Sequence, residues 1–152
     1  MTGYSRRSAL AVLALGVTGA GLAFPAAATS GQVFRSPSCT CCRAWIEHMA
    51  RAGYRLESVI ADDLAAVRRR LGVPDALAAC HTAVVSGFAI EGHVPASDVT
   101  NLLARRPRGA VGLAVPGMPL GSPGMETPND DREAYATLLI LPAGRTRTFA
   151  QH

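Results

Sequence analysis

The spacing of apolar residues changes along the first part of the chain, and each change predicts a new element. The apolar segment at residues 32–35 predicts a strand, and the alternation of apolar and polar side chains over residues 54–60 predicts a second one. Between them, Cys42, Trp45 and Met49 recur at helical spacing. We therefore expect one helix, with one buried face, between two strands.

The pattern continues with a helix, a hairpin and a further helix. Residues 64–71 predict a helix that begins after Asp62 and Asp63, and we interpret this acidic pair as a structural cap. Two short apolar runs, at residues 82–85 and 88–92, are joined by a glycine-containing turn and predict a hairpin. Residues 96–104 predict a third helix.

This order of elements is that of thioredoxin-like α/β domains, and we assign residues 32–108 to one such domain. In that arrangement, the loop before the third strand approaches a Cys-x-x-Cys motif and normally carries a cis-proline. Cys80 and His81 occupy this place here, and no proline is present. The predicted fold would therefore deliver a cysteine and a histidine to the start of the first helix.

A C-terminal extension, residues 109–152, follows the predicted domain. Its first part, residues 112–126, is rich in glycine, proline and methionine and shows neither helical nor strand periodicity, so we expect a loop. Residues 135–141 predict an apolar strand, and residues 146–150 a strand paired with it. We expect this extension to fold over the site at the first helix.

Residues 1–28 have the pattern of a secretory signal peptide. Arg6 and Arg7 precede an uncharged, mostly apolar run at residues 9–22, and small residues follow up to Ala28. A membrane helix needs roughly 20 apolar residues, so a permanent span is disfavoured. Cleavage after Ala28 and retention as an N-terminal anchor both stay open, as do the general and the twin-arginine export routes. We expect the mature chain to have no membrane span and to be a monomer.

The charge of the chain does not indicate nucleic-acid binding. The formal net charge is +4, and arginine supplies all of the basic side chains because the chain contains no lysine. Aromatic residues make up only 5% of the sequence, and they are not interleaved with the arginines. The exclusive use of arginine indicates a bias in the composition of the genome rather than a phosphate-binding surface.

Candidate chemistry is concentrated at residues 39–42, which hold three of the four cysteines. Disulfides between cysteines this close would close very small loops and stabilise little. The start of a helix lowers thiolate pKa values, which favours metal binding or redox chemistry. Thiolates select Cu(I), zinc or iron–sulfur clusters. Cys41 and Cys42 cannot both chelate one ion comfortably with Cys39, so we favour bridging thiolates in a multinuclear Cu(I) centre.

Further soft ligands are available elsewhere in the chain. Cys80 and His81 are metal-ligand candidates, as are Met118 and Met125, because thioethers in a Gly/Pro loop suit Cu(I). His48 lies two helical turns beyond Cys41, so these two side chains cannot easily share one ion.

Two other functions remain open from the residues alone. In a metal-free thiol-disulfide oxidoreductase, Cys39 would be the catalytic nucleophile and Cys42 the resolving thiol. A copper chaperone or buffer would carry the ion without electron transfer. The chemistries could also be linked, since oxidation of Cys39 and Cys42 to a disulfide would supply electrons for copper interconversion.

The chain resembles the CopG-type family of periplasmic copper-resistance proteins, long described as a metal-binding domain of unknown function. The resemblance is carried by four motifs, at residues 36–45, 80–85, 91–95 and 112–126. It implies a thioredoxin-like domain with a C-terminal extension and cysteine-bridged copper at Cys39, Cys41 and Cys42. It also implies a periplasmic location and a role in interconverting Cu(I) and Cu(II) during efflux. An efflux component or a periplasmic electron donor would then be a partner, and the protein a candidate copper oxidoreductase. His93 lies in one motif without an assigned role.

Overall fold

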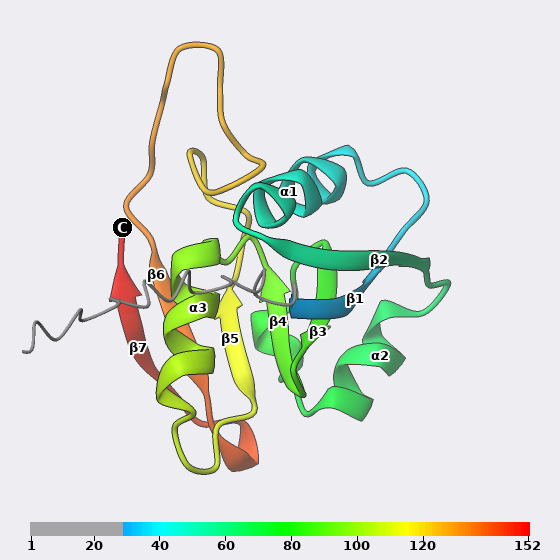
Figure 1. The fold of residues 1–152 in the computed structure, drawn as a ribbon, viewed down its shortest axis with the longest axis vertical. Coiled ribbons are helices and arrows are strands. Elements are labelled where there is room, and N and C mark those ends of the chain that lie inside the picture. Colours follow the sequence, from blue (N-terminus) through cyan, green and yellow to red (C-terminus); the bar gives the residue numbers. More distant parts are fainter. Residues whose placement is uncertain (1–28) are drawn as a thin grey trace, which may run out of the picture.

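Seven strands form one sheet in the described part of the chain, in the order β2-β1-β3-β4-β5-β6-β7 (Figure 1). The structure is a computed structural model and describes residues 29–152, so the predicted signal peptide lies outside the described residues. The strands are β1 (Thr29–Arg35), β2 (Tyr54–Ile60), β3 (His81–Val85), β4 (Phe88–Gly92), β5 (Gly112–Val115), β6 (Ala136–Ile140) and β7 (Thr146–Gln151). The helices are α1 (Thr40–Arg51), α2 (Leu64–Leu71) and α3 (Ala96–Arg105), with short 3₁₀ helices η1 (Asp75–Leu77) and η2 (Pro142–Gly144).

The first four strands have the arrangement expected from the order of elements. β1 and β2 are parallel and connected through α1, whereas β3 runs antiparallel to β1 and β4 antiparallel to β3. The predicted α/β class is confirmed, and this strand order is compatible with the thioredoxin-like arrangement. The bounds of β2, α2 and β4 are those predicted from the sequence.

The sequence predicted a loop over the whole of residues 112–126, and for the first four residues this prediction is wrong. Gly112–Val115 forms β5, which is parallel to β4 and antiparallel to β6. All four of its residues are buried, so no alternation of apolar and polar side chains marks the strand. The extension therefore continues the same sheet rather than forming a separate layer.

The amphipathic face of α1 is buried as predicted. Cys42, Trp45 and Met49 have no solvent exposure, and the Trp45 indole N–H donates to the Val94 carbonyl at 2.9 Å. This bond satisfies the one polar atom of the largest buried side chain. The helix is thereby fixed against the segment that connects β4 to α3.

Both faces of the sheet are covered. Ile90, Leu113 and Leu139 belong to the main core, which includes the buried faces of α1 and α3. Their neighbours along the strands point to the opposite face and pack against the α2–η1 segment. Among the described residues, no helix is long and apolar enough to cross a membrane.

The long connection between β5 and β6 passes beside α1, yellow to orange in Figure 1. Gly124, in this connection, lies against the first turns of α1 and has a φ of +89°. A Cβ atom there would lie 2.8 Å from the backbone nitrogen of Trp45 and 2.9 Å from the Cys41 carbonyl oxygen. Only glycine lets the connection sit this close to the first turn of the helix.

Candidate metal centre

Two segments far apart in the sequence bring all four cysteines together. Cys39 is the N-cap of α1, and Cys41 and Cys42 lie in the first turn of that helix. Cys80 directly precedes β3, which pairs with β1. Cys39 and Cys42 form a disulfide, while Cys41 and Cys80 are free thiols.

The free thiols lie in contact with the disulfide sulfurs. Cys41 Sγ is 3.5 Å from Cys39 Sγ and 3.7 Å from Cys80 Sγ. Cys42 Sγ is 3.6 Å from Cys80 Sγ. All four sulfurs lie within 4.8 Å of one another, which makes them a candidate metal-binding group. The structure thus gathers the four cysteines that the sequence singled out.

Two histidines extend this group from the other side of Cys80. Cys80 Sγ lies 3.1 Å from His93 Nε2 and 3.4 Å from His81 Nδ1. Both imidazoles are fully buried, and the three donor atoms form a second candidate metal-binding group. Cys80 is the member that the two groups share.

The orientation of His93 is set by the C-terminal extension. His93 Nδ1 lies 2.8 Å from the Pro123 carbonyl oxygen, which can only accept, so Nδ1 carries the proton. The lone pair on Nε2 then faces Cys80 Sγ. Burial lowers the pKa of His93 and keeps the ring neutral, the form that binds metals.

His81 presents a buried nitrogen with no protein partner. Its Nε2 has no hydrogen-bond partner among the described residues, and its ring centroid lies 4.5 Å from that of Trp45. Burial, and then the neighbouring His93, lower the pKa of His81 to about 3. A neutral imidazole beside thiols, with an unsatisfied nitrogen, fits a soft metal site.

The Cys80 thiol stays protonated in the metal-free protein. Burial raises its pKa to about 12, and the charge and hydrogen bond of Cys41 act in the same direction. A bound cation would reverse this balance, because metals bind the thiolate and displace the proton. Cys80 is therefore neutral in the metal-free site and becomes a thiolate when a cation binds.

The structure places the two predicted methionine ligands on the connection beside α1. Met125 is half-buried and follows Gly124, the residue in contact with the Cys41 carbonyl. Met118 is 40% exposed and adopts a φ of +52°. Their roles as copper ligands stay predictions.

His48 is occupied elsewhere. The backbone N–H of Ala96 donates to His48 Nε2 at 3.0 Å, at the first residue of α3. The N-cap of that helix is Pro95, which offers no side-chain acceptor, so the imidazole satisfies one free N–H of the helix. Burial lowers the pKa of His48, which preserves the neutral acceptor.

The role of His93 could have been found by counting along the predicted hairpin. Thr82 pairs with Glu91 and Val85 with Phe88, across a two-residue turn. Continuing this antiparallel register beyond the strand end sets His93 opposite Cys80. The motif at residues 91–95 includes His93, but neither its spacing nor its pattern assigns the residue a role.

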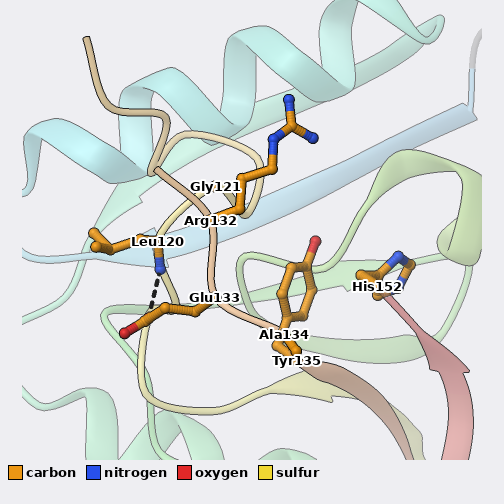
Figure 2. Close-up of a pocket in the computed structure, with 7 residues that line it drawn as sticks. All are labelled: Leu120, Gly121, Arg132, Glu133, Ala134, Tyr135 and His152. Atoms are coloured by element: carbon orange, nitrogen blue, oxygen red, sulfur yellow. Dashed lines mark hydrogen bonds between the residues drawn. The ribbon is translucent and has the colours of Figure 1, made fainter. Parts of the chain in front are cut away.

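A separate cavity of about 520 Å³ lies between the connection and the C-terminal residue (Figure 2). Its lining residues are Leu120, Gly121, Arg132, Glu133, Ala134, Tyr135 and His152. The His152 ring stacks on Tyr135, and its Nε2 lies 2.9 Å from a carboxylate oxygen of Asp98. The cavity contains none of the predicted site residues.

Comparisons with known proteins point to the same family as the motifs. A family model described as a protein of unknown function, DUF411, matches residues 77–125. No curated protein matches the chain. Two solved structures, titled copper resistance protein copG in forms 1 and 2, are each 40% identical with a TM-score of 0.76. The matches cover 82% of this chain and 98% or 97% of theirs, so the chain belongs to the CopG-type family of copper resistance proteins.

Proposed function

We propose that this protein binds more than one copper ion at its thiol cluster and interconverts Cu(I) and Cu(II) as part of copper resistance. The observation that carries the proposal is the position of Cys80, whose sulfur belongs to both donor groups. One group supplies the sulfurs of Cys39, Cys41 and Cys42, and the other the nitrogens of His81 and His93.

The number of donors exceeds what one ion needs. When the Cys39–Cys42 disulfide is reduced, the two groups together offer four thiol sulfurs and two imidazole nitrogens, so a four-coordinate ion would leave two donors unused. A thiolate can bridge two ions, and Cys80 lies in contact with both sets. Soft sulfur donors select Cu(I), and the relatives of this chain are titled copper resistance proteins. These points support a sulfur-bridged copper centre.

The Cys39–Cys42 disulfide offers an electron reservoir for this centre. When both cysteines are reduced, two Cu(II) ions can each accept one electron from them. One S–S bond forms, two protons leave and two Cu(I) ions result. The reverse reaction returns two electrons to the disulfide. The oxidation state of this pair therefore changes both the ligand set and the charge of the copper.

An anaerobic titration of the fully reduced chain with Cu(I) tests the proposal. We expect more than one copper per chain in the unmodified protein and fewer in Cys41→Ser. Thr40→Ser is the matched control, because Thr40 is exposed and lies between Cys39 and Cys41. This variant should bind as many copper ions as the unmodified chain. Binding of at most one copper per chain, unaffected by Cys41→Ser, would refute the multinuclear centre.

A metal-free thiol-disulfide oxidoreductase is the second candidate function. The disulfide at the N-terminus of α1 favours it, since this is where reactive thiolates are stabilised. It predicts turnover of a disulfide substrate that survives Cys41→Ser and Met118→Leu but is lost in Cys39→Ser. Turnover with that pattern, together with no copper binding, would favour this function over the first.

A chaperone or buffer function differs from the redox function in one measurable respect. In the redox function, Cys39 and Cys42 change state as the bound copper is oxidised or reduced. In a chaperone, their thiol count stays constant while copper comes and goes. Counting free thiols and copper in the same anaerobic sample distinguishes the two.

The setting of the proposed activity is the periplasm, with an efflux component or a periplasmic electron donor as partner. The signal-like pattern of residues 1–28 supports export. We expect the mature chain to fractionate with periplasmic proteins and to sediment as a monomer. Recovery only in the cytoplasmic fraction would contradict this assignment.

A further inference from the structure

Glu91 lies on β4, the middle strand of the sheet, and carries a fully buried carboxylate. Its Oε1 accepts the backbone N–H of Ala79 at 2.7 Å, and its Oε2 accepts the hydroxyl of Thr82 at 2.6 Å. Arg68, on α2, brings a guanidinium nitrogen to within 3.6 Å of Oε1. A buried carboxylate is costly unless it is compensated, and here two hydrogen-bond donors and one guanidinium group lie against it.

These contacts lie on both sides of the Cys80-His81 pair. Ala79 immediately precedes Cys80, and Thr82 immediately follows His81. The backbone of residues 78–80 lies between η1 and β3, outside either element. The carboxylate therefore holds the chain just before the shared cysteine and just after the neighbouring histidine.

Gly92 shows that the same segment packs closely against β4. It has a φ of +71°, and a Cβ atom at this position would lie 2.7 Å from the Ala79 Cβ and 2.5 Å from the Val115 carbonyl oxygen. The Glu91-Gly92 pair thus combines a hydrogen-bond acceptor for the segment with the space for it to approach. The segment before Cys80 is therefore restrained by a side chain of β4 as well as by close packing.

We infer that Glu91 is the positioning residue for Cys80 and His81, holding the Cys80 sulfur where both donor groups meet. The carboxylate does not touch the sulfurs; it acts through the Ala79 N–H and the Thr82 hydroxyl. The part of this inference that concerns copper rests on the proposed function. The part that concerns the position of Cys80 does not, and it can be measured without metal.

The metal-free test uses Cys80 as its own reporter. In Cys41→Ser with the Cys39–Cys42 disulfide intact, Cys80 is the remaining free thiol among the described residues. We expect Glu91→Gln in that background to speed alkylation of Cys80 by iodoacetamide about tenfold, the effect of one lost charge-assisted hydrogen bond on local opening. Glutamine keeps the shape of glutamate but cannot accept from all of the donors.

Asp98→Asn is the matched control. Asp98 is also buried and accepts a threonine hydroxyl, that of Thr137, at 2.6 Å, but it lies in α3. In Cys41→Ser, adding Asp98→Asn should leave the rate of Cys80 alkylation within about twofold of the rate in Cys41→Ser alone. An unchanged rate in Glu91→Gln, or an equal increase in both variants, would overturn the inference.

The copper test applies the same pair of variants to the reduced chain. Cu(I) affinity, measured by competition with a chromophoric chelator, should fall about 10–100-fold in Glu91→Gln and stay near that of the unmodified chain in Asp98→Asn. Equal affinity in Glu91→Gln and the unmodified chain would overturn the copper part of the inference. Failure of the unmodified chain to bind Cu(I) would instead refute the proposed function, and the alkylation rates would still decide the role of Glu91.

A measurement on the unmodified protein guards against a variant that does not fold. The Ala79 amide donates to a buried carboxylate, so we expect its proton to exchange slowly with solvent and to resonate downfield in the nuclear magnetic resonance spectrum. Rapid exchange of this amide, at the rate of an exposed loop, would overturn the inference without any substitution.

Discussion

Cys80 Sγ lies 3.1 Å from His93 Nε2, across the open end of the hairpin formed by β3 and β4. This contact joins the thiol cluster at the start of α1 to the buried imidazoles behind it. It also connects the site to the extension, because the other nitrogen of His93 is held by the Pro123 carbonyl.

His93→Gln should weaken the copper site selectively. Glutamine can still donate to the Pro123 carbonyl, but it has no imidazole nitrogen to place beside Cys80. Loss of this donor should reduce the affinity for one copper equivalent by at least the 10–100-fold typical of a lost outer partner. An anaerobic titration monitored by ultraviolet charge-transfer absorption checks this. Retention of every equivalent at unchanged affinity would show that His93 is not a ligand.

Gly124→Ala should destabilise the protein by displacing the connection from α1. The substitution adds backbone strain at φ +89° and a Cβ atom 2.8 Å from the backbone nitrogen of Trp45. Together they should lower the free energy of unfolding by about 2–4 kcal/mol. Urea unfolding measures this cost. Gly117→Ala is the matched control, because Gly117 has a φ of +81° and nothing within 4 Å of its Cβ position. Equal losses in the two variants would contradict the close contact.

His81 should make the metal-free protein sensitive to acid. Burial lowers its pKa to about 3 from an ordinary value of 6.5, so the unfolded chain binds the proton more readily. Stability is therefore lost as the pH falls from 6.5 towards 3, by about 2–3 kcal/mol at pH 4.5 relative to pH 7. Urea unfolding at these two pH values should show a smaller loss in His81→Leu. An identical loss in both proteins would contradict this role of His81.

Copper binding should release a proton from Cys80. Burial raises the pKa of this thiol to about 12, so it is protonated at neutral pH and must lose its proton to become a ligand. Apparent Cu(I) affinity should therefore rise with pH, by about tenfold per unit for each proton displaced. Proton release in weakly buffered solution should be smaller in Cys80→Ser. The same release from both proteins would contradict the role of Cys80.

The elements with clear periodicity were predictable from the sequence, and β5 was not. The spacing of Cys42, Trp45 and Met49 identified the buried face of α1. The acidic pair before residue 64 identified the start of α2, where Asp63 accepts the Ala66 N–H. In Gly112–Val115 every residue is buried, so the pattern that marks a half-exposed strand is missing.

The site could be predicted in part. The cysteines and His81 were identified from residue type and from the expected approach of the third strand. His93 and Glu91 were not, because each acts through a contact across the sheet that depends on strand register rather than on local sequence. The two helical turns between Cys41 and His48 argued against a shared ion, and the His48 imidazole in fact accepts from the first residue of α3.

X-ray absorption at the copper K edge of the reduced, Cu(I)-loaded chain tests the central claim most directly. A sulfur-bridged centre predicts a first shell dominated by sulfur, with a nitrogen contribution that decreases in His93→Gln, and copper–copper scattering that is lost in Cys41→Ser. A single copper with no copper–copper scattering, or a first shell of oxygen and nitrogen alone, would contradict the account.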